Sequence, residues 1–193
     1  MITLPSHRIG ILILSVIPMT CVASTGSLGE GQRQNDVQIK LSWEYTGLPP
    51  GMRVYEPRKG AVLEVWETGS VKQEKDLPVS REVANSIVTV SRGSRKILVL
   101  VYENKAAQSV YFFAAPHAVA PPESSLGLKL KCLCINQAFE VSPGESWYRV
   151  IEVQASKNFR GDGFEIKHTV VGIDKERKKK FERPMSFSAS DLG

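Results

Sequence analysis

The chain has 193 residues, 42% of them hydrophobic, and a formal net charge of +5, a size that suits one domain with its own core. Six basic and two acidic residues lie between Lys175 and Arg183, so most of the excess charge sits near one end. The body of the chain is close to neutral and has no electrostatic footprint for nucleic acid. We therefore expect no nucleic-acid partner.

The N-terminal segment carries an uncharged run from Ile9 to Met19, about eleven residues long. That is the length of the hydrophobic region of a signal peptide and is short of the ~20 residues that span a bilayer. Small residues around Cys21 predict cleavage after Ala23, so residues 1–23 are interpreted as a signal peptide. The alternatives are a lipidated Cys21 or an uncleaved membrane anchor. All three place the remaining chain in the periplasm or another extracytoplasmic space.

Residues 24–36 are rich in Gly, Ser, Gln and Asn and are predicted to form a flexible leader. From Val37 onward, short apolar runs are separated by Gly and Pro, which is typical of strands and turns. We predict strands at 37–44, 62–66, 87–90, 97–102, 110–113, 126–135, 147–153 and 164–171.

No stretch has a sustained helical period, so the sequence predicts an all-β fold. The spacing of strands and turns indicates an immunoglobulin-like antiparallel β-sandwich of about eight strands over residues 37–174. Residues 175–193 are predicted to be a basic flexible tail, free to touch an anionic membrane or an acidic partner.

Cys132 and Cys134 form a Cys-x-Cys pair, the only cysteines outside the predicted signal peptide. In a strand they would share one face with Cα atoms about 6.5–7 Å apart, at or beyond the upper limit for a disulfide. Two thiolates on one face can instead converge on a soft ion, Cu(I) first and zinc second. A structural zinc site takes four ligands, whereas Cu(I) accepts two or three, so the pair favours Cu(I).

A purely structural role for the pair is also open. The two cysteines follow Leu126, Leu128 and Leu130 in steps of two residues, so on a regular strand all five side chains would point to the same face. Free cysteine is among the most frequently buried residues, so both sulfurs could simply extend a core stripe. The alternation fails at Leu133 and Ile135, where a bulge or a strand end could turn the sulfurs outward.

Two histidines were weighed as further ligands. His117 lies between Pro116 and Ala118 in a loop-like stretch, fifteen residues before Cys132. Imidazole suits copper, so His117 is a candidate third ligand, although a solvated loop side chain is the simpler alternative. His168 has the parity of its apolar neighbours at 166 and 170, which predicts a core or rim position in preference to a ligand.

No catalytic constellation stands out in the sequence. It contains no Gly-x-Ser-x-Gly motif, and the two histidines have no positioned acid that would complete a triad. We therefore expect a protein that is not an enzyme.

Around the cysteine pair the sequence resembles a known family. Pro116 lies sixteen residues before Cys132 with Pro121 close by, and Pro143-Gly144-Glu145 begins nine residues after Cys134. Between them stands Cys-Leu-Cys-Ile-Asn-Gln, and Asn104 and the strand at 164–171 also have counterparts in that family. Over residues 96–173 the chain resembles the CtaG-type copper chaperones, which help to build the copper B site of cytochrome c oxidase.

The resemblance implies that Cys132 and Cys134 are Cu(I) ligands on an immunoglobulin-like sandwich. It also implies a membrane-anchored, extracytoplasmic protein that forms dimers in which paired cysteine motifs share copper. Leu133 and Ile135 replace the aromatic residues of the family's motif, and the N-terminal apolar run is shorter than its anchor. These departures leave the copper-accepting enzyme open.

The expected function is that of an exported Cu(I) metallochaperone, which takes copper from a donor protein and delivers it to a cuproenzyme such as cytochrome c oxidase. The alternative is a metal-free periplasmic immunoglobulin-like module that binds a protein partner.

Overall fold

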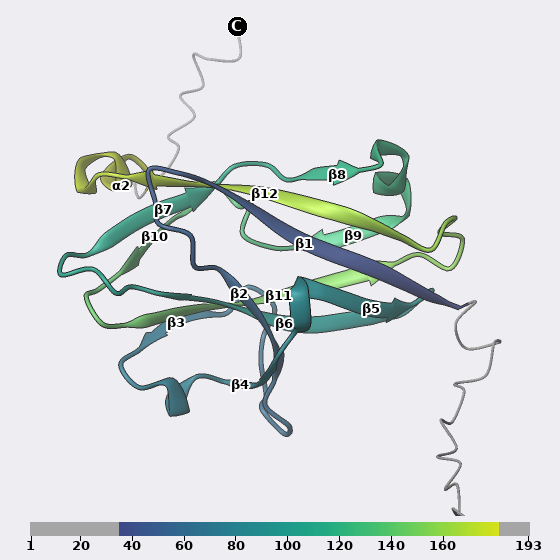
Figure 1. Cartoon of the computed structure of the whole chain (residues 1–193), viewed down its shortest axis with the longest axis horizontal. Helices are drawn as coiled ribbons and strands as arrows, with labels where there is room; N and C mark the ends of the chain where they lie inside the picture. Colours follow the sequence, from purple (N-terminus) through teal and green to yellow (C-terminus); the bar gives the residue numbers. More distant parts are fainter. Residues whose placement is uncertain (1–34, 182–193) are drawn as a thin grey trace, which may run out of the picture.

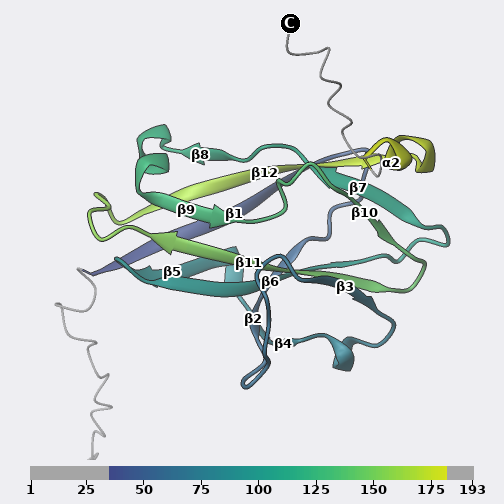
Figure 2. The same cartoon turned by 180° about the vertical axis from the view of Figure 1, so that it is seen from behind.

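In the computed structural model, which describes residues 35–181, two six-stranded β-sheets pack face to face (Figures 1 and 2). The predicted all-β sandwich is confirmed. The strands are β1 (Asp36–Thr46), β2 (Arg53–Pro57), β3 (Thr68–Val71), β4 (Val79–Glu82), β5 (Ile87–Ser91), β6 (Arg95–Glu103), β7 (Val110–Ala114), β8 (Ala118–Ala120), β9 (Leu128–Lys131), β10 (Ala138–Val141), β11 (Ser146–Ala155) and β12 (Gly163–Ile173).

The first sheet has the order β10-β7-β12-β1-β5, and β8 pairs with β12 beside β7. The second has the order β3-β11-β6-β2-β4, and β9 pairs with β11 beside β3. The two longest strands, β1 and β12, run parallel, whereas the other strand pairs of residues 35–181 are antiparallel. The expectation of a purely antiparallel sandwich is therefore wrong for this one pair.

The described residues form twelve strands, more than the eight or so that were predicted. The long apolar strands were found by the sequence pattern, but the short strands β2, β3, β4, β8 and β10 were not. The strand predicted at 62–66 is wrong, because this segment is a loop in which the Val62 side chain is 95% exposed. Short strands carry too few residues for a period of two to stand out from chance.

Strand β6, predicted at 97–102, is buried on both faces from Leu98 to Tyr102. Leu98 and Leu100 point into the main core between the sheets. Val99 and Val101 point the other way and are covered by Leu77, which lies in the segment between β2 and β5 that folds over the outer face.

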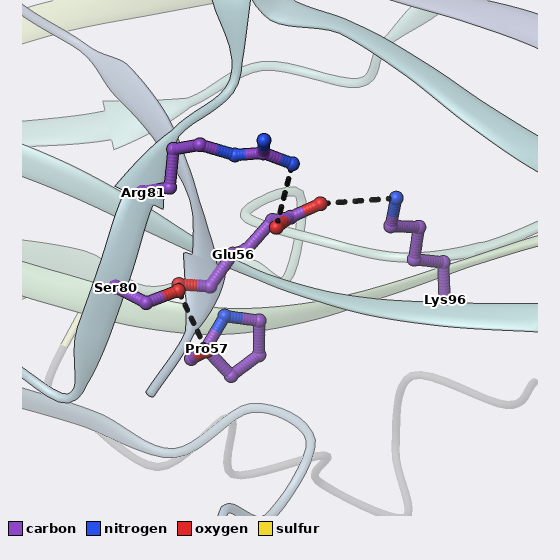
Figure 3. Close-up of polar contacts among 5 residues, drawn as sticks. All are labelled: Glu56, Pro57, Ser80, Arg81 and Lys96. Atoms are coloured by element: carbon purple, nitrogen blue, oxygen red, sulfur yellow. Dashed lines mark hydrogen bonds and ion pairs between the residues drawn. The ribbon is translucent and has the colours of Figure 1, made fainter. Parts of the chain in front are cut away.

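That outer segment is also held by charged side chains. Glu56 on β2 forms ion pairs with Arg81 on β4 at 3.1 Å and with Lys96 on β6 at 3.4 Å (Figure 3). The Ser80 hydroxyl donates to the carbonyl oxygen of Pro57 at 3.0 Å where the β2–β4 register shifts. These contacts fasten the edge strand β4 to the sheet.

One long strand in each sheet has an edge that is shared by two short strands. On β12, β8 pairs with residues 165–167 and β7 with residues 170–173. On β11, β9 pairs with residues 152–155 and β3 with residues 146–149. Between the two ladders, no strand pairs with His168 and Thr169 of β12 or with Val150 and Ile151 of β11, which we call the break in each sheet. Single backbone hydrogen bonds still reach the Thr169 carbonyl and both backbone groups of Val150.

The chain after β12 differs from the predicted flexible tail. Residues Lys175–Phe181 form a short helix, α2, which lies against β7 and β10 (Figure 1). The Lys178 ammonium pairs with the Glu140 carboxylate at 2.9 Å, and the Phe181 ring lies 5.1 Å from the ring of Phe113. The prediction of a flexible tail is therefore wrong for residues 175–181, and its remainder lies outside the described residues.

The predicted leader reaches only to Asn35, because β1 already begins at Asp36. The predicted signal peptide at 1–23 lies outside the described residues. Within residues 35–181, we find no helix of the length and apolar character that crossing a membrane requires.

Candidate metal centre

His117 is positioned by the break in the first sheet. It directly precedes β8, whose first residue, Ala118, is the partner of Lys167 on β12. One further step along this ladder brings His117 beside His168, and the centroids of the two imidazole rings are 5.7 Å apart. The break between β8 and β7 therefore leaves two histidines side by side at the inner surface of the sheet.

Cys132 and Cys134 lie in a loop, because β9 ends at Lys131 and β10 begins at Ala138. The predicted strand over 126–135 is thus wrong at both ends, since residues Pro122–Gly127 form a 3₁₀ helix, η3. The Ile135 amide donates to the Leu133 carbonyl at 2.8 Å, which closes a three-residue turn centred on Cys134. This turn folds the two sulfur atoms to within 3.3 Å of each other.

The turn brings the cysteines to the histidines. The Cys132 sulfur lies 3.8 Å from Nδ1 of His117. One potential ligand atom from each of His117, Cys132, Cys134 and His168 lies within 4.8 Å of the corresponding atoms of the other three. The structure thus joins all three residues that the sequence singled out and adds a fourth.

The four side chains are buried to different depths. His168 is fully buried and the Cys132 residue is 4% exposed, whereas Cys134 and His117 are only partly buried. The sequence left open whether the sulfurs converge or point into the core. In the structure the two sulfurs converge, and Cys132 at the same time packs into the main core cluster.

His168 has the position that its parity predicted, but not the surroundings. Its ring stacks on the Trp43 indole with centroids 4.9 Å apart. Within residues 35–181 no group lies at hydrogen-bond distance from either ring nitrogen, although the ring is close enough to Cys132 to lower the pKa of that thiol. A buried polar atom without a partner is unusual and calls for an explanation such as an ion. The alternation of residues along the strand could place His168 in the core. That it lies near the cysteines is seen only in the structure, where the pairing of β8 with β12 sets it beside His117, which contacts Cys132.

The surroundings of the cluster shift the pKa values of the two thiols in opposite directions. The hydrogen bond between the two sulfurs lowers the pKa of Cys132, and His117 and then His168 lower it further. The same hydrogen bond, followed by burial, raises the pKa of Cys134. Contact with the Cys132 sulfur raises the pKa of His117. The arrangement favours one thiolate that shares a proton with the second thiol and faces an imidazole.

The donor set decides which ions the cluster suits. Thiolate and imidazole are ligands for copper and zinc, and the cluster has no carboxylate that would favour Mg²⁺ or Ca²⁺. Two cysteines and two histidines are also a complete tetrahedral set for zinc. The argument from two cysteines alone, that zinc lacks ligands here, therefore no longer holds.

Two other motifs behind the resemblance have structural roles. Asn104 is 2% exposed. Its side-chain NH₂ group donates to the carbonyls of Gln108 at 2.8 Å and Val141 at 2.9 Å. Its side-chain oxygen accepts from the Ala106 amide at 3.0 Å. The Gly144 amide donates to the Asn104 carbonyl, and Gly144 has φ of 70°, which favours glycine. These residues clasp the β6–β7 loop to the β10–β11 turn and lie outside the metal cluster.

Comparisons with known proteins identify the family without assigning an activity. No curated protein and no solved structure matches the chain. One family matches residues 37–173, a span that begins one residue inside β1 and ends at the last residue of β12. The chain therefore belongs to the family described as a domain of unknown function, DUF8709.

Proposed function

We propose that this protein binds one Cu(I) ion through His117, Cys132, Cys134 and His168 and hands it to a copper-dependent enzyme outside the cytoplasm. The observation that carries the proposal is the convergence of four soft or borderline ligand atoms within 4.8 Å of one another. The two unpartnered nitrogens of the buried His168 add to it, because ligation would satisfy one of them.

The graded burial of the ligands supports transfer. Cys132 and His168 form an inner pair, while Cys134 and His117 form an outer pair that is partly exposed. An acceptor protein could displace the outer ligands first while the inner pair still holds the ion. Stepwise exchange avoids release of a free ion at any stage.

A structural zinc site is the second candidate, favoured by the complete set of four ligands in one chain. In that case the ion would stabilise the loop between β9 and β10 and would not be transferred. The metal-free interaction module remains the alternative if the cluster binds no ion.

The test is a titration of the full, reduced chain with Cu(I) under anaerobic conditions, in competition with a colorimetric Cu(I) chelator. We expect about one Cu(I) per chain, and loss of that binding when both cysteines are replaced in Cys132→Ser/Cys134→Ser. Met52→Leu is the matched control, because Met52 is a buried sulfur residue in the same core cluster and the exchange conserves its volume. Copper retention that is unchanged in the double variant would overturn the site.

A further inference from the structure

A buried arginine lies in the core between the sheets, on the strand that pairs with β9 just before the cysteine loop. Arg149 on β11 is 2% exposed and has the parity of Trp147, Ile151 and Val153, which belong to the core between the sheets. Its side chain therefore points into the sandwich. Its guanidinium carbon lies 5.4 Å from the centre of the Phe139 ring, and its Nε and Nη2 atoms have no hydrogen-bond partner.

The position of Arg149 follows from the break in the second sheet. The β9–β11 ladder ends with Lys131 opposite Glu152, and a ladder continued for three more residues would bring Cys134 opposite Arg149. The chain turns into the cysteine loop at this point. Burial lowers the pKa of Arg149, and the charge of Cys132 opposes that shift. Arginine nevertheless stays protonated in proteins, so a positive charge lies inside the sandwich, in the core that Cys132 also enters.

No carboxylate within residues 35–181 forms an ion pair with this guanidinium. The nearest acidic residue along β11, Glu152, has the opposite parity and is already paired with Arg95 at 3.3 Å and with Lys131 at 3.2 Å. A buried, unpaired charge strongly destabilises a fold. Among the described residues, the negative group that acts on this guanidinium is the Cys132 thiolate.

We infer that Arg149 makes the site selective for a monovalent ion over a divalent one. This inference rests on the proposed function. Two metal-bound thiolates carry two negative charges and the imidazoles none, so a site loaded with Cu(I) has a net charge of −1 that Arg149 neutralises. A site loaded with Zn²⁺ is already neutral, and the guanidinium would then remain as an uncompensated buried cation.

The charge of Arg149 thus disfavours Zn²⁺, the ion that the four ligands alone would bind most readily. Four ligands of the Cys₂His₂ type suit zinc, but the surroundings of the ligands suit Cu(I). Residues around a metal site, beyond those that touch the ion, commonly tune its properties in this way.

The experiment compares Cu(I) and Zn²⁺ affinities of the full chain for the wild type, Arg149→Met and Arg149→Lys, each measured by chelator competition. Arg149→Met removes the charge and roughly keeps the volume, so Cu(I) affinity should fall, Zn²⁺ affinity should rise, and their ratio should shift toward zinc at least tenfold. Arg149→Lys keeps the charge and should stay within threefold of the wild-type ratio. Should Arg149→Met unfold, Arg149→Gln makes the same comparison.

Opposite changes in the two affinities separate a charge effect from structural damage, which would weaken both ions together. A ratio that is unchanged in Arg149→Met, while the wild type binds Cu(I), overturns the inference and leaves the proposed function standing. Failure of the wild type to bind either ion overturns the proposed function and the inference with it.

Discussion

His168 shows a conflict between stability and binding at the scale of one residue. Within residues 35–181 its two buried ring nitrogens have no hydrogen-bond partner, and an unsatisfied buried polar group destabilises a protein by about 1–3 kcal/mol. The ring also stacks on Trp43 and sits within a densely packed interior. A side chain selected only for packing would be apolar here.

We therefore predict that His168→Leu leaves the apo protein as stable as the wild type or more stable by about 1 kcal/mol. The same change should abolish most of the increase in thermal stability that Cu(I) gives the wild type, because a ligand stabilises only the state that binds it. Thermal unfolding of both proteins, with and without Cu(I), checks both parts. An apo variant that is much less stable than the wild type would mean that the imidazole is satisfied in solution.

The two thiols allow a second prediction, on pH. The hydrogen bond between the sulfurs is the largest cause of the lowered pKa of Cys132. Cys134→Ala removes this hydrogen bond and should raise the pKa of Cys132, whereas Cys134→Ser retains a donor and should raise it less. The ultraviolet absorbance of the thiolate, followed across a pH titration, measures the change.

The sign of the accompanying change in stability follows from linkage. Because the pKa of Cys132 is lowered by folding, its thiolate stabilises the wild type above the pKa of an unfolded thiol, about 8.5. This stabilisation is lost as the pH falls through the folded-state pKa. The stability difference between wild type and Cys134→Ala should thus shrink toward acid, and a difference that grows toward acid would contradict the assignment.

At the scale of elements, the loops that hold the metal cluster depend on a clasp some distance from it. Asn104 ties the loop after β6 to β10 by the hydrogen bond that it donates to the Val141 carbonyl, and its bonds with Gln108 and Ala106 hold the loop itself. Strand β10 directly follows the cysteine loop. Buried amides that satisfy several backbone groups cannot be replaced by a shorter side chain without leaving those groups unpaired.

Asn104→Ala should lower the free energy of unfolding by roughly 2–3 kcal/mol, because it leaves the Val141 carbonyl without this donor inside the protein. Asn158→Ala, an exposed turn position, is the matched control and should change stability by no more than about 0.5 kcal/mol. Chemical denaturation measures both. Equal effects of the two variants would show that the clasp adds nothing.

Several elements show where sequence reasoning succeeds and where it stops. The long alternation of β1 and the apolar run of β6 are local patterns, so their strands and burial could be predicted. Helix α2 could not, because its seven residues are mostly charged and it is held by contacts with β7 and β10, far away in sequence. Edge strands such as β8 are defined by pairing alone, which no local pattern reveals.

The candidate site follows the same division. Cys132, Cys134 and His117 could be chosen from residue chemistry and spacing within one stretch of the chain. His168 could be placed in the core or at its rim from its spacing, but its position beside the cysteines depends on the tertiary arrangement. Arg149 was not singled out at all, because a lone arginine in an apolar strand has no local pattern that signals burial. Their roles are properties of the tertiary arrangement.

For the whole molecule, the structure changes the expectation about assembly. The resemblance to copper chaperones implied a dimer with shared copper, since two thiolates leave Cu(I) open to further ligands. The four potential ligands within one chain would satisfy a Cu(I) ion without a partner. We therefore predict that the reduced protein sediments as a monomer both without metal and with one Cu(I) per chain. A dimer that forms only with Cu(I), and not in Cys132→Ser, would restore the shared cluster.

X-ray absorption at the copper edge of the Cu(I)-loaded full chain identifies the ligands of the ion. We predict one copper per chain with two sulfur and one or two imidazole nitrogen neighbours, and loss of nitrogen scattering in His117→Gln/His168→Leu. A copper shell without sulfur, or a shell unchanged by replacing both histidines, would contradict it.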